Sequence, residues 1–347
     1  MNYAPLAPIL ILSILATGCS GARTAFAPLP SSALGAPAAQ SVRAAAARAK
    51  YVYVSGDIAW SSPSSGNAEL AVYAASANGN AAPVHVFTGT ASQLKGPEQP
   101  AVDASGRVWV CDTTADALFS YASGLSGQAP DTVITGSNTQ LDGCGGVAIA
   151  RSGAIYATSF GGNAVLEYAA GSHGNAAPIA TLAGSLTTLL QPFDLAFDGS
   201  GRLYVANYGG RSTLVFGNGA GNVAPARTIA GSNTRTNVSY AVAIDPTSQR
   251  IVVANAGNDT VQVFAPGANG NAAPVSWIAG AKTMLVNPYG VAVDGAGYTY
   301  VGTCPTGYHL QAAILVFAPG ARGNVAPVQT ISGTKTNLGC VTGLAVR

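Results

Sequence analysis

The stretch Gly270-Asn271-Ala272-Ala273-Pro274 decides the fold, because close variants of it recur at a regular interval along the chain. The six variants end at Pro83, Pro130, Pro178, Pro225, Pro274 and Pro327, so they are 47, 48, 47, 49 and 53 residues apart. A period of this length, with several strand patterns and no helical pattern in each unit, is typical of β-propeller blades. We therefore predict an all-β propeller.

Four strands can be recognised in each unit, most clearly at 241–245, 250–254, 260–264 and 275–279. These runs of β-branched and aromatic residues alternate with Gly, Asn, Asp and Pro. The repeated Gly-Asn-Ala-Ala-Pro motif falls between the third and fourth strands. Asn and Gly there accept a positive φ, and Pro can open an edge strand without losing a needed donor. We predict a structural role for the motif.

The two ends of the repeat region are incomplete and complement each other. Residues 343–347 match only the innermost strand of a blade, whereas residues 51–54 match the second strand. Together they complete one blade. We expect six four-stranded blades, closed into a ring by strand exchange with the C-terminal strand.

Two segments carry a resemblance to a known family. Pro-Tyr-Gly-Val-Ala-Val-Asp at 288–294 and the run at 253–264 are similar to the NHL repeat, and the likeness covers 51–347. The resemblance implies the propeller fold. It does not imply an activity, since this fold occurs in lyases, lactonases and pure binding modules.

The N-terminal region has the features of an export signal. Residues 6–16 form an apolar run that is too short to span a bilayer and has the length of a signal h-region. The following Thr17-Gly18-Cys19 completes a segment that resembles a bacterial lipobox. This implies a signal peptide at 1–18 and a lipid anchor on Cys19; ordinary secretion is the alternative.

Residues 19–50 are rich in Ala, Pro and Ser and are predicted to form a flexible tether ahead of the propeller at 51–347. Ser20, the residue after the lipidated cysteine, is one that usually permits transfer to the outer membrane of Gram-negative bacteria. We expect a cell-envelope protein, lipid-anchored at the outer membrane or facing the periplasm, or an extracellular one.

Charge excludes one class of partner. Charged residues make up 9% of the chain, the net charge is +2, and there is no run of like charge. Such a surface offers no electrostatic footprint for nucleic acid. We expect a monomer that binds an envelope protein, a glycan or a small ligand.

Alignment of the repeats predicts which residues surround the mouth of the central channel. The position just before the innermost strand holds Thr342, Glu98, Gly145, Phe193, Tyr240 and Tyr289 in the six blades. At the next position, Asp194 is the only acid. We take Glu98, Asp194, Phe193, Tyr240 and Tyr289 as a candidate ligand mouth; ordinary packing of rim aromatics is the alternative.

Two loops on the same face exceed their counterparts in the other blades, at 55–67 and 303–311. They carry Asp57, Trp60, Tyr308 and His309 outside the repeat pattern. Because functional residues concentrate on loops of a rigid scaffold, these four form a candidate loop wall. By contrast, Asp103, Asp198, Asp245 and Asp294 share one place after the innermost strand and are predicted to form turns.

Residue placement argues against catalysis, and we assign no catalytic residue, metal ligand or cofactor. His85, His173 and His309 fall in separate parts of the repeat, which disfavours the zinc site of amidating lyases with this fold. The segment beginning Glu98-Gln99-Pro100 is similar to the metal-binding segment of calcium-dependent lactonases. Only Glu98 carries over. We expect a non-catalytic binding or scaffold protein, with a calcium-dependent lactonase-like hydrolase as the alternative.

The four cysteines of the propeller predict two disulfides. Cys111 and Cys144 lie on the mouth side of adjacent blades, and Cys304 and Cys340 repeat that relation across the closure. The crossed pairings would have to reach across the ring, beyond the limit of about 7 Å between Cα atoms. We predict Cys111–Cys144 and Cys304–Cys340; four buried free thiols are the alternative.

Overall fold

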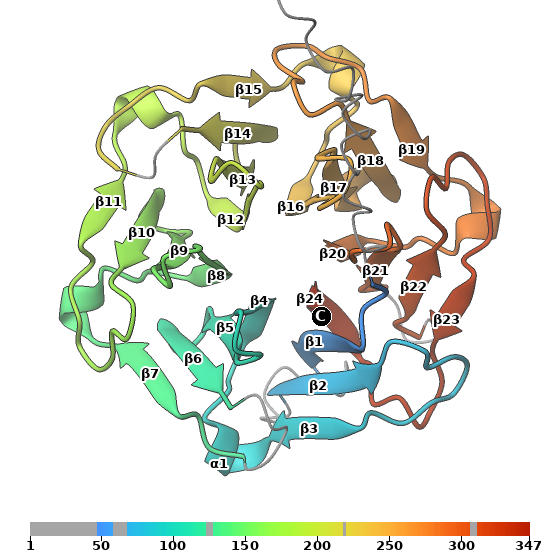
Figure 1. The fold of residues 1–347 in the computed structure, drawn as a ribbon, viewed down its shortest axis with the longest axis horizontal. Coiled ribbons are helices and arrows are strands. Elements are labelled where there is room, and N and C mark those ends of the chain that lie inside the picture. Colours follow the sequence, from blue (N-terminus) through green and yellow to red (C-terminus); the bar gives the residue numbers. More distant parts are fainter. Residues whose placement is uncertain (1–46, 58–67, 123–127, 218–219, 306–310) are drawn as a thin grey trace, which may run out of the picture. The chain divides into compact units, whose positions relative to one another are not determined.

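Six four-stranded antiparallel blades follow one another around a central axis (Figure 1), as the repeat predicts, and a single parallel bridge between Gln99 and Gly146 joins the sheets of two neighbouring blades. The computed structural model describes residues 47–57, 68–122, 128–217, 220–305 and 311–347. The predicted signal peptide, Cys19 and most of the predicted tether lie outside the described residues, as do Trp60, Tyr308 and His309. In the part of the chain that is described, no helix is long and apolar enough to cross a bilayer.

Each blade runs from an innermost to an outermost strand. Blade 1 holds β4 (Pro97–Val102), β5 (Val108–Asp112), β6 (Ala117–Tyr121) and β7 (Thr132–Thr135); blade 2 holds β8 (Cys144–Ile149), β9 (Ile155–Ser159), β10 (Ala164–Tyr168) and β11 (Ala180–Leu182). Blade 3 holds β12 (Pro192–Phe197), β13 (Leu203–Asn207), β14 (Ser212–Phe216) and β15 (Arg227–Ile229). Blade 4 holds β16 (Ser239–Ile244), β17 (Ile251–Asn255), β18 (Thr260–Phe264) and β19 (Ser276–Ile278). Blade 5 holds β20 (Pro288–Val293), β21 (Thr299–Thr303), β22 (Ile314–Phe317) and β23 (Gln329–Ile331).

Blade 6 confirms the predicted strand exchange. Its order is β24 (Cys340–Val346), β1 (Tyr51–Asp57), β2 (Ala68–Ala74) and β3 (His85–Thr88), so the two ends of the chain share one sheet. Strands β24 and β1 are antiparallel, with Val346 opposite Val52 and Leu344 opposite Val54. The ring is therefore closed by backbone hydrogen bonds between sequence-distant segments.

Short helices connect most blades. Helix α1 (Gly89–Ser92) leads from blade 6 to blade 1, and the 3-10 helices η1 (Ser137–Thr139), η2 (Ser185–Thr187), η3 (Ser232–Thr234) and η5 (Ala281–Thr283) hold the same place later in the chain. A further 3-10 helix, η4 (Ala256–Asn258), joins β17 to β18.

In five of the six blades the repeated Gly-Asn-Ala-Ala-Pro motif joins its blade to the blade before it. Its glycine forms a parallel bridge with the preceding outermost strand, as in Gly174 with Ile134 and Gly221 with Leu182. The asparagine oxygen then accepts an N–H bond from the connection that follows that strand. Five such bonds, each 2.7–2.8 Å long, run from the backbone N–H of Lys335 to Asn80, Asn138 to Asn175, Leu186 to Asn222, Asn233 to Asn271 and Lys282 to Asn324. The motif is a structural clamp between blades.

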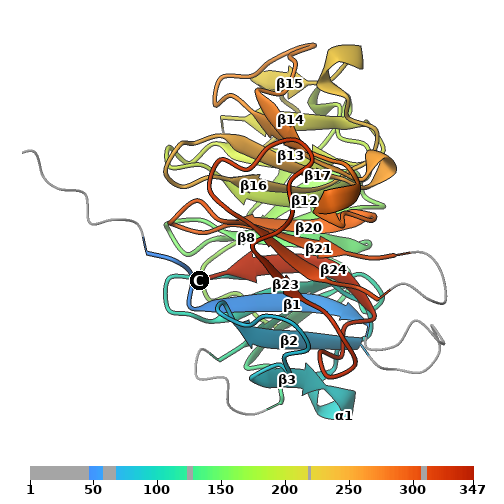
Figure 2. The ribbon, with the colours of Figure 1, turned by 90° about the vertical axis from the view of Figure 1, so that its right-hand side faces the viewer.

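The propeller has two faces that differ in which connections they carry (Figure 2). We call the face where the innermost strands begin the mouth face, and the opposite one, which carries the turns between first and second strands, the turn face. The chain enters blade 6 on the turn face: Ala49 donates its N–H to the Asp294 carboxylate at 3.2 Å, and the Arg48 guanidinium lies 4.2 Å from the Tyr298 ring centroid.

Candidate functional site

A β-bulge at the start of each innermost strand creates the ring of residues around the mouth. In blade 3, Pro192 pairs with Asn207 and Asp194 with Ala206, which leaves Phe193 without a partner in the ladder. Tyr240 and Tyr289 take the same place in blades 4 and 5. These positions lie inside the innermost strand, not just before it as the repeat alignment suggested. Bulges re-aim side chains, and here they bring aromatic rings of three blades together.

Phe193, Tyr240 and Tyr289 form a continuous row of rings. The ring centroids of Phe193 and Tyr240 are 4.9 Å apart in an edge-to-face arrangement, and those of Tyr240 and Tyr289 are 4.1 Å apart and stacked. Both geometries are favourable for aromatic pairs, each contributing about 0.5–1.5 kcal/mol beyond burial. The row therefore links blades 3, 4 and 5 into one surface.

Two further aromatics, which the repeat alignment missed, extend this row. Phe160 and Tyr208 directly follow β9 and β13, the second strands of blades 2 and 3. The Phe160 ring lies 6.1 Å from Phe193, and the Tyr208 ring lies 5.2 Å from Tyr240. The sequence could have predicted both residues, because the position that directly follows the second strand of a blade also lies on the mouth face. We call these five residues the aromatic platform: Phe160, Phe193, Tyr208, Tyr240 and Tyr289.

The platform is neutral and partly open to solvent. Phe193 is buried, whereas the other four rings are half-buried. Burial raises the pKa of Tyr240 far above its usual value, and a hydrogen bond with Tyr289 and the nearby charge of Glu98 raise it further. The Tyr240 hydroxyl therefore stays protonated at neutral pH and presents both a donor and an acceptor.

The structure separates Asp194 from the other predicted mouth residues. Its carboxylate is buried in the wall of the central channel and accepts N–H bonds from Leu195 at 2.8 Å and from Val242 at 2.9 Å. Burial raises the pKa of Asp194 to about 7, although both hydrogen bonds act in the opposite direction. Asp194 therefore ties blade 3 to blade 4 and titrates near neutral pH.

The central channel is a cavity of about 490 Å³ lined by the innermost strands of all six blades. Its walls are mostly aliphatic, and its polar side chains are Gln99 and Asp194. The Gln99 amide donates to the backbone oxygens of Tyr289 at 2.9 Å and of Thr342 at 2.8 Å. Near the mouth the innermost strands pack closely, since a Cβ atom on Gly146 would lie 2.8 Å from the Phe193 oxygen.

Of the predicted loop wall, only Asp57 belongs to the described residues. It is the last residue of β1, opposite Ala68 of β2 and Cys340 of β24. Trp60, Tyr308 and His309 lie outside the described residues, so this wall stays a prediction. Glu98, in the bulge of β4, is half-buried.

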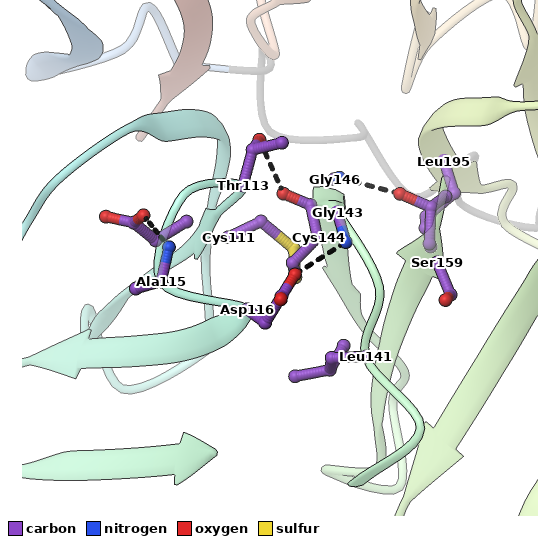
Figure 3. Close-up of a disulfide and its surroundings, with 12 residues drawn as sticks. Cys111, Thr113, Ala115, Asp116, Leu141, Gly143, Cys144, Gly146, Ser159 and Leu195 are labelled. Atoms are coloured by element: carbon purple, nitrogen blue, oxygen red, sulfur yellow. Dashed lines mark hydrogen bonds between the residues drawn. A yellow bond between two sulfur atoms is a disulfide. The ribbon is translucent and has the colours of Figure 1, made fainter. Parts of the chain in front are cut away.

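Both predicted disulfides are confirmed. Cys111 of β5 is bonded to Cys144, the first residue of β8, with their Cα atoms 5.1 Å apart (Figure 3). Beside this bond, the Thr113 hydroxyl donates to the Cys144 oxygen at 3.1 Å. Cys304 and Cys340 are bonded across the closure, with Cα atoms 4.4 Å apart. Each disulfide joins neighbouring blades, and such bonds persist in oxidising compartments outside the cytoplasm.

The turn acids are structural, as predicted. Asp103 accepts N–H bonds from Ser105 at 2.8 Å and Arg107 at 3.1 Å, and Asp198 bonds its own turn in the same way. Among the residues that the structure describes, no three His, Cys, Asp or Glu side chains come together in an arrangement that could hold a metal ion.

Comparison with known proteins supports the fold alone. No family model and no curated protein matches the sequence. A crystal structure of a protein of unknown function from Bacteroides caccae has a TM-score of 0.60 and 10% identity, covering 86% of this chain and 99% of that one. Nidogen in complex with laminin has a TM-score of 0.57 and 14% identity, covering 85% and 97%. A putative 6-phosphogluconolactonase from Bacteroides uniformis has a TM-score of 0.56 and 15% identity, covering 86% and 85%.

Proposed function

We propose that this protein is an exported, lipid-anchored, non-catalytic binding protein of the cell envelope, and that its aromatic platform binds a glycan. The observation that carries the proposal is the platform itself, in which rings from blades 2 to 5 form one partly exposed surface at the mouth. Aromatic faces carry negative partial charge. The C–H faces of a sugar ring carry the complementary charge, so a sugar can lie flat on such rings.

The polar groups of the platform favour the same ligand class. Its three tyrosine hydroxyls can donate and accept hydrogen bonds and so suit sugar hydroxyls, and the charge of Glu98 bears on Tyr240. Tyrosine combines a rigid ring with a polar tip and loses little entropy on binding. A neutral glycan chain therefore fits these groups.

The described chain enters the propeller on the face opposite the platform. Residues 47–50 reach the propeller on the turn face, where Ala49 bonds Asp294. A flexible tether that joins the propeller on this face leaves the mouth face, with its platform, free of the entering chain.

A glycan array, followed by titration calorimetry with the best oligosaccharide found, tests the proposal. The double variant Phe160→Ala with Tyr208→Ala removes two half-buried rings that lie outside the strands, so the fold is retained. We expect at least tenfold weaker binding. Trp277→Ala is the matched control, since it removes an exposed ring from the outermost strand of blade 4. Equal affinities of the parent and the double variant would refute the platform as the site.

The lipid anchor is tested separately. We expect a radioactive fatty acid to label the parent and not Cys19→Ser when both are expressed in a Gram-negative host. Undiminished labelling of the variant would remove the anchor, and the glycan site would remain to be judged on its own test.

A further inference from the structure

One turn departs from the repeat. The residue after the innermost strand is Asp103, Asp198, Asp245 or Asp294 in blades 1, 3, 4 and 5, but it is Ala150 in blade 2. The backbone of the turn is unchanged: Ala150 donates to the Ala154 oxygen at 2.9 Å, as Asp198 does to Arg202 at 3.0 Å. Only the carboxylate is missing.

In blades 1, 3 and 5 the turn aspartate accepts hydrogen bonds from a backbone N–H and from a side chain of the second strand, and blade 2 lacks this acceptor. In blade 3, Asp198 bonds the N–H of Ser200 through one oxygen and the Tyr204 hydroxyl through the other, and blades 1 and 5 repeat this with Trp109 and Tyr300. In blade 2 the corresponding groups are the N–H of Ser152 and the Tyr156 hydroxyl. Tyr156 is hydrogen bonded to Glu167 instead, and within the described residues the Ser152 N–H has no acceptor.

A cavity of about 540 Å³ lies beside this turn. Its apolar walls are Ile149, Tyr156, Phe197, Ile244 and Pro246, from blades 2, 3 and 4. The rings of Tyr156 and Phe197 meet edge to face at 4.9 Å. The cavity shares four of these residues, all except Tyr156, with the central channel, so it is the widening of the channel at the turn face.

Arg151 supplies a positive charge at this cavity. It lines the cavity, is exposed, and has no hydrogen bond or ion pair in the described part of the chain. Two acids are close to this charge, and each has a partner: Asp198, which also lines the cavity, forms an ion pair with Arg202 at 2.6 Å, and Glu167 bonds Tyr156. The other blades place Ala, Gly or Pro where blade 2 has Arg151.

We propose that this cavity binds a small amphipathic carboxylate. The ligand carboxylate takes the place of the absent turn aspartate, paired with Arg151 and accepting the Ser152 N–H, while its hydrocarbon part fills the apolar cavity. A charge-assisted bond to an arginine fork is among the stronger polar contacts in proteins. Few precisely placed polar groups at one end of an apolar pocket are the usual layout of a small-molecule site.

The probe is 2-naphthoate, with 2-naphthalenemethanol as its neutral counterpart, titrated into the intact protein by calorimetry. We expect naphthoate to bind and the alcohol to bind at least tenfold more weakly, which corresponds to about 1.4 kcal/mol. We expect Arg151→Ala to weaken naphthoate by a similar factor. Arg322→Ala, which removes an exposed arginine elsewhere, is the control and leaves the affinity unchanged.

Ala150→Asp is the decisive variant, because it restores the turn carboxylate that four other blades already accommodate. It is expected to fold, to melt no lower than the parent, and to lose naphthoate binding. Naphthoate binding by Ala150→Asp at parental affinity would overturn the proposal. So would equal affinities for naphthoate and the alcohol, or no naphthoate binding at millimolar concentration.

Discussion

The buried carboxyl of Asp194 makes the stability of the propeller depend on pH in an unusual direction. Its pKa is raised from 3.8 to about 7 in the folded protein by burial, and among the described residues it is the one titratable side chain that lines the channel. An acid whose pKa is raised on folding stabilises the protein when protonated. That contribution is complete below about pH 3.8 and is lost as the pH rises through 7.

The size of this effect follows from the interval between the two pKa values. One pKa unit corresponds to about 1.4 kcal/mol, so raising the pH from 4 to 8 removes about 4 kcal/mol of unfolding free energy. For a body of this size, 1 kcal/mol shifts the melting temperature by roughly 2 °C. Asp194 alone thus lowers the melting temperature by about 8 °C. Asp103 and Asp198, whose pKa values are lowered by their hydrogen bonds, act only below about pH 4.

Calorimetric melting of the parent and of Asp194→Asn at pH 4.5 and pH 8 isolates this term. The amide keeps the size of the side chain but cannot ionise, so its melting temperature changes less between the two pH values. At pH 4.5 Asp194 is protonated, and both of its oxygens can still accept the backbone N–H groups of Leu195 and Val242, whereas the amide NH2 cannot accept, so the variant is less stable than the parent at this pH. If both proteins lose the same number of degrees between pH 4.5 and pH 8, Asp194 does not titrate in this range.

Three further predictions concern closure, crosslinks and calcium. Deleting residues 343–347 removes Leu344 and its pairing with β1. Loss of one buried leucine costs about 2–5 kcal/mol, so we expect the melting temperature to fall by at least about 4 °C. A shift within about 1 °C would contradict closure by β24. Replacing Cys304 and Cys340 by Ala opens a crosslink across 36 residues and is expected to cost about 3–4 kcal/mol, and equal melting of variant and parent would show that the bond adds nothing. Adding 5 mM calcium is expected to leave the melting temperature unchanged for a binding protein, whereas a rise of several degrees would favour the lactonase-like alternative through ligand stabilisation of the native state.

The repeat was sufficient to predict the blades, the closure and both disulfides, because each depends on spacing. Once the register of the blades is known, Cys111 and Cys144 are expected to meet, because both lie at the mouth-face ends of strands in neighbouring blades. The sequence also predicted that the repeated motif is structural, from its Gly, Asn and Pro residues. Its partners lie in the preceding blade, which a single unit does not reveal.

The site was less predictable because it depends on side-chain direction. Phe193 and Asp194 are adjacent, yet one joins the platform and the other lines the channel, since successive residues of a strand point to opposite sides and a bulge changes which side is which. The repeat alignment did not predict Phe160 and Tyr208 as site residues, because they lie in turns, one residue after the second strands of their blades. The cavity at Ala150 is marked only by the absence of a repeated carboxylate.

The polar groups of the channel bear on where a ligand can bind. Gln99 holds the backbone of blades 5 and 6, and Asp194 holds that of blades 3 and 4. A ligand that recruited either side chain would have to break these bonds between blades, each contributing about 1 kcal/mol and leaving a buried backbone group unpaired. A ligand that bound the aromatic platform or Arg151 would not have to break hydrogen bonds of this kind. Ligand binding is therefore favoured at the two ends of the channel, where polar and aromatic groups are open, over its interior, where polar groups stabilise the ring.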